Sequence, residues 1–185
     1  MGDLIGKSVK RVEDNRFLKG EGKYTDDFNM PNQTFAVYVR SPHAHANLVS
    51  VDISAAKAMD GVINVFTGKD IKDAGIVGSI CGWQVDFKNG DTMKEPGHPI
   101  LAVDKVRHVG DAVALVIAED IGKAKDAAGA VEVNYKVLDA IVDPKAAAQD
   151  GAPQVHDDVP NNTIFDWELG NKDETDAAFE NAHHI

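Results

Sequence analysis

The chain has 185 residues, of which 43% are hydrophobic, and carries a formal net charge of −11. This length can bury a substantial core and suits one domain with extensions, whereas the acidic balance argues against broad binding to nucleic acid or anionic lipid. The single cysteine, Cys81, excludes an internal disulfide and a metal site made only of cysteines.

The sequence carries no evident targeting feature. Residues 1–11 lack the apolar stretch of a signal peptide, and no apolar run approaches the roughly 20 residues that cross a bilayer. We therefore expect a cytoplasmic protein in a reducing compartment.

Residues 1–32 are rich in glycine and charge and show no sustained periodicity. A short helical turn is predicted from Glu13 to Leu18, before Gly20 and Gly22 interrupt it. The large apolar side chains of this segment include Phe17, Leu18, Tyr24 and Phe28. Because such groups gain nothing in water, we interpret residues 1–32 as an extended arm that packs on another part of the molecule rather than as a floppy terminus.

Alternating apolar residues predict three strands in the next part of the chain: Thr34–Arg40, Leu48–Ile53 and Val62–Phe66. In the second strand, Val49, Val51 and Ile53 are expected to share one face. The break between the first two strands falls at Pro42, which cannot donate a hydrogen bond to a sheet.

Two short helices and a long loop are predicted around these strands. One helix covers Ala55–Met59, and the spacing of Thr67 and Asp70 is that of a capping box that opens another. Between Asp73 and Pro99 the pattern dissolves into five glycines, two prolines and mixed charges. A loop of this length in a compact domain is usually functional, disordered or packed on a partner.

Val106–Tyr135 reads as one strand–helix–strand unit. Ala112–Ala118 is an unbroken apolar run, which is typical of a strand covered on both faces. Asp120 is placed to cap a helix, and the sequence then alternates from Val131 to Tyr135. A connection of this kind suits parallel pairing of the two strands.

The predicted fold class is α+β, with six or seven strands in one mixed sheet and two or three helices packed on it. A strand over Ile100–Val106 and a helix that begins at Asp143–Pro144 complete the central part. We therefore divide the chain into an N-terminal arm (1–32), a central domain (33–148), and a linker with the start of a further domain (149–185).

His43 and His45 form the most metal-like pair in the sequence. Side chains two residues apart share a face of a strand, so two imidazoles could hold one ion. A metal site needs a third ligand, however, and none is placed nearby in the sequence, while Pro42 favours a loop. A small metal-dependent hydrolase that uses His43 and His45 is therefore kept only as an alternative.

The other reactive side chains match no catalytic pattern. Cys81 is followed by Gly82-Trp83 and has no assigned base, so a structural cysteine is favoured over a nucleophile. His183 and His184 are adjacent and are expected to point apart. We predict no catalytic, cofactor-binding or metal-binding residue in these 185 residues. A non-enzymatic adaptor domain is a further alternative.

Six stretches, in the same order, resemble one enzyme family: residues 5–28, Val39–Ala46, Gly61–Thr67, Val106–Val116, Ala130–Tyr135 and Asn162–Phe179. They are similar to the start of the molybdopterin-binding subunit of molybdenum hydroxylases, the xanthine dehydrogenase and aldehyde oxidase family. The last stretch is most similar to large subunits of aerobic carbon monoxide dehydrogenases.

This resemblance implies an α/β hammerhead domain that precedes the molybdenum-binding domains. It implies a molybdenum–molybdopterin cytosine dinucleotide cofactor, with copper in the carbon monoxide-oxidising form, bound outside these residues. The implied partners are a flavin subunit and an iron–sulfur subunit, in a homodimer of heterotrimers at the inner face of the cytoplasmic membrane. Cys81 matches no copper ligand of the family, and a relative that oxidises aldehydes or heterocycles remains an alternative.

Overall fold

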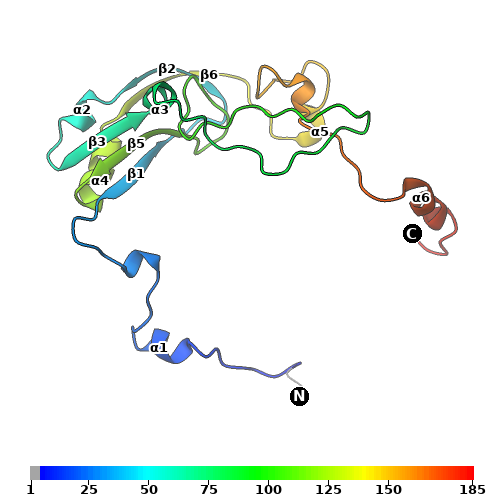
Figure 1. Cartoon of the computed structure of the whole chain (residues 1–185), viewed down its shortest axis with the longest axis horizontal. Helices are drawn as coiled ribbons and strands as arrows, with labels where there is room; N and C mark the ends of the chain where they lie inside the picture. The colour runs from blue at the N-terminus through cyan, green and yellow to red at the C-terminus, as the bar shows by residue number, and fades with distance from the viewer. Residues whose placement is uncertain (1–4) are drawn as a thin grey trace. The chain divides into compact units, whose positions relative to one another are not determined.

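The computed structural model describes residues 5–185, so the first four residues of the predicted arm lie outside it. The chain divides into two compact units, residues 1–34 and 35–185. The first unit contains the helix α1 (Asp14–Leu18) and the 3₁₀ turn η1 (Thr25–Asp27), drawn in blue in Figure 1. The predicted helical turn is therefore confirmed, while the predicted boundaries at residues 32 and 148 stay predictions.

The N-terminal unit is held mainly by local contacts. The rings of Phe17 and Tyr24 stack with centroids 5.6 Å apart. The backbone N–H of Tyr24 donates to the carboxylate of Asp27 at 2.8 Å. Several of its large apolar side chains are nevertheless exposed: Val9, Val12, Leu18, Tyr24, Phe28 and Met30.

The first sheet of the second unit has the order β1–β5–β3, and all its pairs are antiparallel. Its strands are β1 (Phe35–Arg40), β5 (Ala112–Ala118) and β3 (Val62–Thr67). Side chains of β1 alternate between half-buried and exposed, as the sequence predicts. The central strand, β5, is buried on both faces, which explains its unbroken apolar run.

The second sheet has the order β4–β2–β6 and is also antiparallel. It consists of β4 (Lys105–Val106), β2 (Ala46–Asp52) and β6 (Glu132–Val137). Its inner face packs Leu48, Val51, Val133 and Tyr135 on a buried cluster around Val106. The sequence predicts a strand over Ile100–Val106, but in the structure only its last two residues, Lys105 and Val106, form a strand.

The α+β class is confirmed, but the predicted parallel pairing of β5 with β6 is wrong. Both edges of β5 are already occupied, by β1 and by β3. No edge is left for β6, so the helix α4 (Ile121–Gly129) carries the chain from one sheet to the other. Two antiparallel sheets therefore replace the single mixed sheet (Figure 1).

A β-bulge in β2 changes which side chains share a face. The pairing with β6 shifts between Leu48 and Ser50, so Val49 has no partner in the ladder. Val49 is 66% exposed, whereas Val51 packs on the inner cluster. The prediction that Val49 and Val51 share a face is wrong because an extra residue at a bulge reverses the alternation.

The helices α3 and α4 begin where the sequence places capping residues. Asp120 accepts from the N–H of Lys123 at α4, and Thr67 and Asp70 form the predicted capping box of α3 (Gly68–Asp73). A second core cluster joins Ala127 of α4 to the first sheet. The remaining helices are α2 (Ser54–Lys57), α5 (Pro144–Ala147), η2 (Pro160–Asn162) and α6 (Lys172–Glu180). Within residues 5–185, no helix has the length and apolar character of a membrane span.

The predicted linker after residue 149 is tied to the central domain. Val159 is fully buried, and Lys105 of β4 pairs with Asp157 at 2.8 Å. The side chain of Asn162 accepts from the N–H of Val155 and donates to two backbone carbonyls, one of them that of Ala147. These bonds hold residues 147–162 in one compact loop.

Candidate functional site

Two loops that are distant in sequence meet at the end of β1. The backbone N–H of Ser41 donates to the carbonyl of Asp111, and the N–H of Gly110 donates to the carbonyl of Ser41, both at 2.8 Å. Arg40 also donates to the carbonyl of Gly110 at 2.8 Å. Ser41 is buried and exchanges hydrogen bonds with the backbone of His43. This junction shapes the loop that carries both candidate histidines.

His43 and His45 do not face a common site. The ring of His43 packs edge to face on the ring of Tyr135, with the two ring centroids 4.9 Å apart. His45 is 6% exposed, and its Nδ1 lies 2.9 Å from the carbonyl oxygen of Asp139. Within residues 5–185 no group of three or more His, Cys, Asp or Glu side chains is placed to hold a metal ion. The geometry therefore favours a packing role for both histidines.

A hollow of about 320 Å³ lies between the long loop, which is residues 73–99, and the C-terminal segment, which is residues 149–185. Its lining includes Cys81, Glu95, His98 and His156. Cys81 is exposed, its N–H donates to the carboxylate of Glu95, and its Sγ donates to the carbonyl of Trp83 at 2.9 Å. The thiol is thus engaged with the backbone of its own loop.

A neighbouring hollow of about 200 Å³ is lined by polar groups, among them His98, Arg107, His108, Asp111 and His156. Arg107, the residue after β4, donates to the carbonyl of Val155 at 3.2 Å and so ties this end of the strand to the loop of residues 147–162. Burial, followed by the nearby charge of Arg107, lowers the pKa of His156 below its ordinary value. The folded chain therefore resists protonation of this imidazole.

We expect His156→Gln to flatten the acid side of the stability profile. Because the folded state holds the lower pKa, the unfolded chain takes up the proton first, so this contribution to stability is complete above about pH 6.5 and is lost as the pH falls below it. Thermal melts between about pH 7.5 and 5.5 should show a smaller fall in the melting temperature for the variant. Exposed His183→Gln is the control. Equal slopes for His156→Gln and the parent chain would contradict the assignment.

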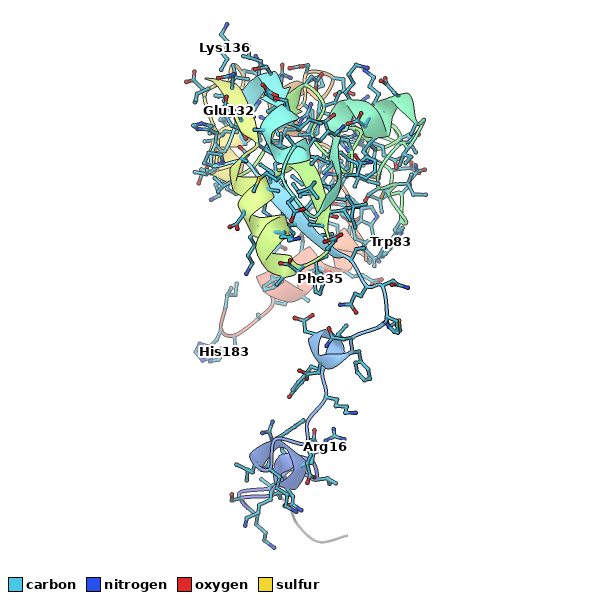
Figure 2. The ribbon with its side chains drawn as sticks, turned by 90° about the vertical axis from the view of Figure 1, so that its left-hand side faces the viewer. Arg16, Phe35, Trp83, Glu132, Lys136 and His183 are labelled. Carbon is cyan, nitrogen blue, oxygen red and sulfur yellow. The ribbon has the colours of Figure 1, made fainter. Side chains whose placement is uncertain are left out.

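The C-terminal histidines differ from expectation. The ring centroids of His183 and His184 lie only 4.4 Å apart, so the prediction that they point apart is wrong. Both residues are exposed at the end of the chain, and Figure 2 shows His183 beyond the helix α6. Neither is near His43 or His45 in any contact that the structure records.

The long loop and the C-terminal segment form a two-part surface that carries large apolar side chains. The N–H groups of Lys88 and Lys94 donate to the carbonyls of Asp166 and Ile164, each at 2.8 Å. Trp83 meets Trp167 edge to face at 6.2 Å. Exposed apolar side chains cluster in both parts: Ile76, Val77, Ile80, Trp83, Phe165, Trp167 and Leu169. Figure 1 shows the loop, in green, running beside the segment that follows α5.

Comparison with known proteins places these features in a family. The chain is 37% identical to the carbon monoxide dehydrogenase large chain of Afipia carboxidovorans over 98% of its own length and 22% of that protein. It is 39% identical to the nicotine 6-hydroxylase large subunit of Paenarthrobacter nicotinovorans, over 99% of the chain and 21% of that subunit. The chain thus spans about a fifth of the length of these curated relatives.

A solved structure shares the fold. The chain matches a crystal structure of the Cu,Mo-CO dehydrogenase with a TM-score of 0.71 and 36% identity, over 96% of this chain and 22% of that one. The family model described as aldehyde oxidase and xanthine dehydrogenase, a/b hammerhead domain, matches residues 19–139. The predicted hammerhead fold is therefore confirmed, and the chain belongs to the aldehyde oxidase and xanthine dehydrogenase family.

Proposed function

We propose that the chain is the N-terminal hammerhead part of the large, molybdopterin-binding subunit of an aerobic carbon monoxide dehydrogenase. The match along nearly the whole chain to the large chain from Afipia carboxidovorans is the observation that carries this proposal. The complete enzyme would oxidise carbon monoxide with water to carbon dioxide, two protons and two electrons. The electrons would pass through iron–sulfur clusters to flavin.

The role proposed for these residues is that of a scaffold. The arm, the long loop and the C-terminal segment all expose large apolar side chains. Exposed apolar surface of this kind marks a site of interaction with protein or another apolar partner. In the complete enzyme, the rest of the large subunit and the partner subunits would cover it.

The cofactor of the complete subunit would be molybdenum–molybdopterin cytosine dinucleotide, with copper in a carbon monoxide-oxidising enzyme. The similar solved structure is named as a copper- and molybdenum-containing enzyme. Among residues 5–185 there is no cluster of side chains that fits such a metal. We propose that the cofactor lies in another part of the subunit, because this chain spans only about a fifth of the length of the similar large chains, and no step of the reaction is assigned to the described residues.

The proposed partners are a flavin subunit and an iron–sulfur subunit. With the large subunit they would form a heterotrimer, and two heterotrimers would form the complete enzyme. We propose that this assembly is cytoplasmic and lies at the inner face of the cytoplasmic membrane. The net charge of −11 argues against nucleic acid as a partner.

A relative that oxidises an aldehyde or a heterocycle is the second candidate. The nicotine 6-hydroxylase large subunit is 39% identical, as similar as the carbon monoxide dehydrogenase large chain. Both candidates share the scaffold role. The hydrolase alternative is disfavoured because His43 packs on Tyr135 while His45 is buried against the carbonyl of Asp139.

Purification of the affinity-tagged native protein from its source cells tests this proposal. We expect molybdenum, a pterin, flavin and iron–sulfur clusters in the purified complex, and reduction of a dye acceptor that depends on carbon monoxide. The isolated 185-residue chain, assayed in parallel, should bind no molybdenum or pterin and give no reduction above the blank.

The two candidates differ in this assay. Dye reduction with aldehydes or nicotine but not with carbon monoxide would replace the first candidate by the second. A native complex without molybdenum would overturn both. Stoichiometric metal in the isolated chain that is lost in His43→Ala or His45→Ala would instead restore the hydrolase alternative.

A further inference from the structure

The strand β6 forms an open edge of the second sheet. Its six residues pair with β2 on one side, and within the described chain no strand pairs with its other side. Such an edge presents a row of N–H and C=O groups that can pair with another strand. A partner strand could therefore extend the sheet at β6.

The outer face of β6 carries a negative charge near one end and a positive charge near the other. Glu132, Asn134 and Lys136 are exposed on this face, at two-residue intervals. Asn134 donates to the hydroxyl of Ser50 on β2 at 2.8 Å, which fixes the centre of the strand. Figure 2 shows Lys136 projecting away from the body of the domain.

Glu132 stands opposite a like charge within its own sheet. Its partner in the register of β2 is Asp52, so two carboxylates face each other across the pair. Like charges directly opposite each other destabilise a strand pair. A cation on the free side of β6 would offset this repulsion, and β6 itself carries one at Lys136.

We propose that β6 pairs antiparallel with β6 of a second copy of this chain, about a two-fold axis at Asn134. In that register Glu132 of each copy lies opposite Lys136 of the other. On the inner face Val133 lies opposite Tyr135, an aliphatic–aromatic pair of the kind that stabilises antiparallel sheets. Val137, the last residue of β6, is 61% exposed in the single chain. The strand is thus complementary to itself in charge and shape.

The alternative role of edge charges is to prevent pairing. Charges that serve this purpose repel an approaching copy. Glu132 and Lys136 have opposite signs at positions symmetric about Asn134, so in this register they attract the second copy. Two such ion pairs form in each dimer because the axis generates both. The dimer joins two three-stranded sheets into one continuous six-stranded sheet.

Charge reversal in the 185-residue chain tests the pairing, with the dimer measured by sedimentation equilibrium over a concentration series. Lys136→Glu and Glu132→Lys should each raise the dimer dissociation constant by about tenfold or more, because two attractive pairs become repulsive. The double variant E132K/K136E exchanges the signs and should return the constant to within about threefold of the parent. Exposed Lys125→Glu on α4, which makes the same change in net charge as Lys136→Glu, should have no such effect.

Cross-linking tests the register independently. In a Cys81→Ser background, Asn134→Cys should form a covalent dimer with a short bismaleimide, because the two thiols meet at the axis. Lys125→Cys in the same background should not. A chain that stays monomeric at every concentration would overturn the proposal. So would a dimer that is insensitive to both single reversals, or one that the double variant fails to restore.

Discussion

Leu101→Ala is expected to lower the free energy of unfolding by about 2–5 kcal/mol, a large loss for the truncation of one side chain. Leu101 is 1% exposed and is among the largest fully buried side chains of the chain. The next residue, Ala102, donates its N–H to the carbonyl of Ala112 at 2.7 Å, so the backbone at this point is tied to β5. Because that bond holds the backbone in place, the structure has little freedom to collapse into the cavity that the variant leaves.

Thermal or urea unfolding measures this loss. For a unit of this size the melting temperature should fall by about 4–20 °C. Leu169→Ala is the matched control, because Leu169 is 85% exposed and its truncation should change the stability by less than about 0.5 kcal/mol. Similar small shifts for both variants would show that Leu101 is not part of a packed core.

Gly68→Ala is expected to destabilise the domain by about 1–3 kcal/mol, although alanine is the better helix former. Gly68 is the first residue of α3, and a Cβ atom there would lie 2.1 Å from the carbonyl oxygen of Ala102. The obstacle is backbone rather than a flexible side chain. Either α3 or the backbone segment at Ala102 must therefore shift, which also strains the core cluster that contains Ala102.

Gly129→Ala provides a control of opposite sign. Gly129 is the last residue of α4, and nothing lies within 4 Å of the position of its Cβ atom. Relief of the backbone entropy of glycine should make this variant neutral or more stable by up to about 1 kcal/mol. The urea midpoint should thus fall for Gly68→Ala and stay unchanged or rise for Gly129→Ala, and a stabilising Gly68→Ala would contradict the close approach of α3 to Ala102.

Local elements were predictable because local patterns specify them. The alternation in β1 and the capping box at Thr67 both appear in the structure as the sequence predicts. The sheet arrangement was not predictable in this way, because the choice of partner for β5 depends on β1 and β3, which are distant in the chain. The bulge at Val49 has no local signal, since valine fits a regular strand equally well.

In the candidate site, too, the local features were predictable from the sequence, whereas the contacts between distant residues were not. The motif at Ser41–Ala46 marked a real structural junction, yet its histidines face different neighbours. The role of Asn162 was missed, although one signal was present. Asn161 and Asn162 both have positive φ, a conformation that asparagine tolerates better than most residues, and the pair stands beside Pro160 as in a tight turn.

The pairing of distant segments in both sheets also governs how the chain folds as it is made. Phe35 pairs with Ala118, and Ala46 pairs with Val137, so each sheet joins the start of the domain to its end. Closing such long loops makes folding slow. During synthesis, β1 and β2 leave the ribosome well before β5 and β6 exist to pair with them. Their apolar faces therefore stay unpaired for seconds, a period in which the nascent chain is prone to aggregation.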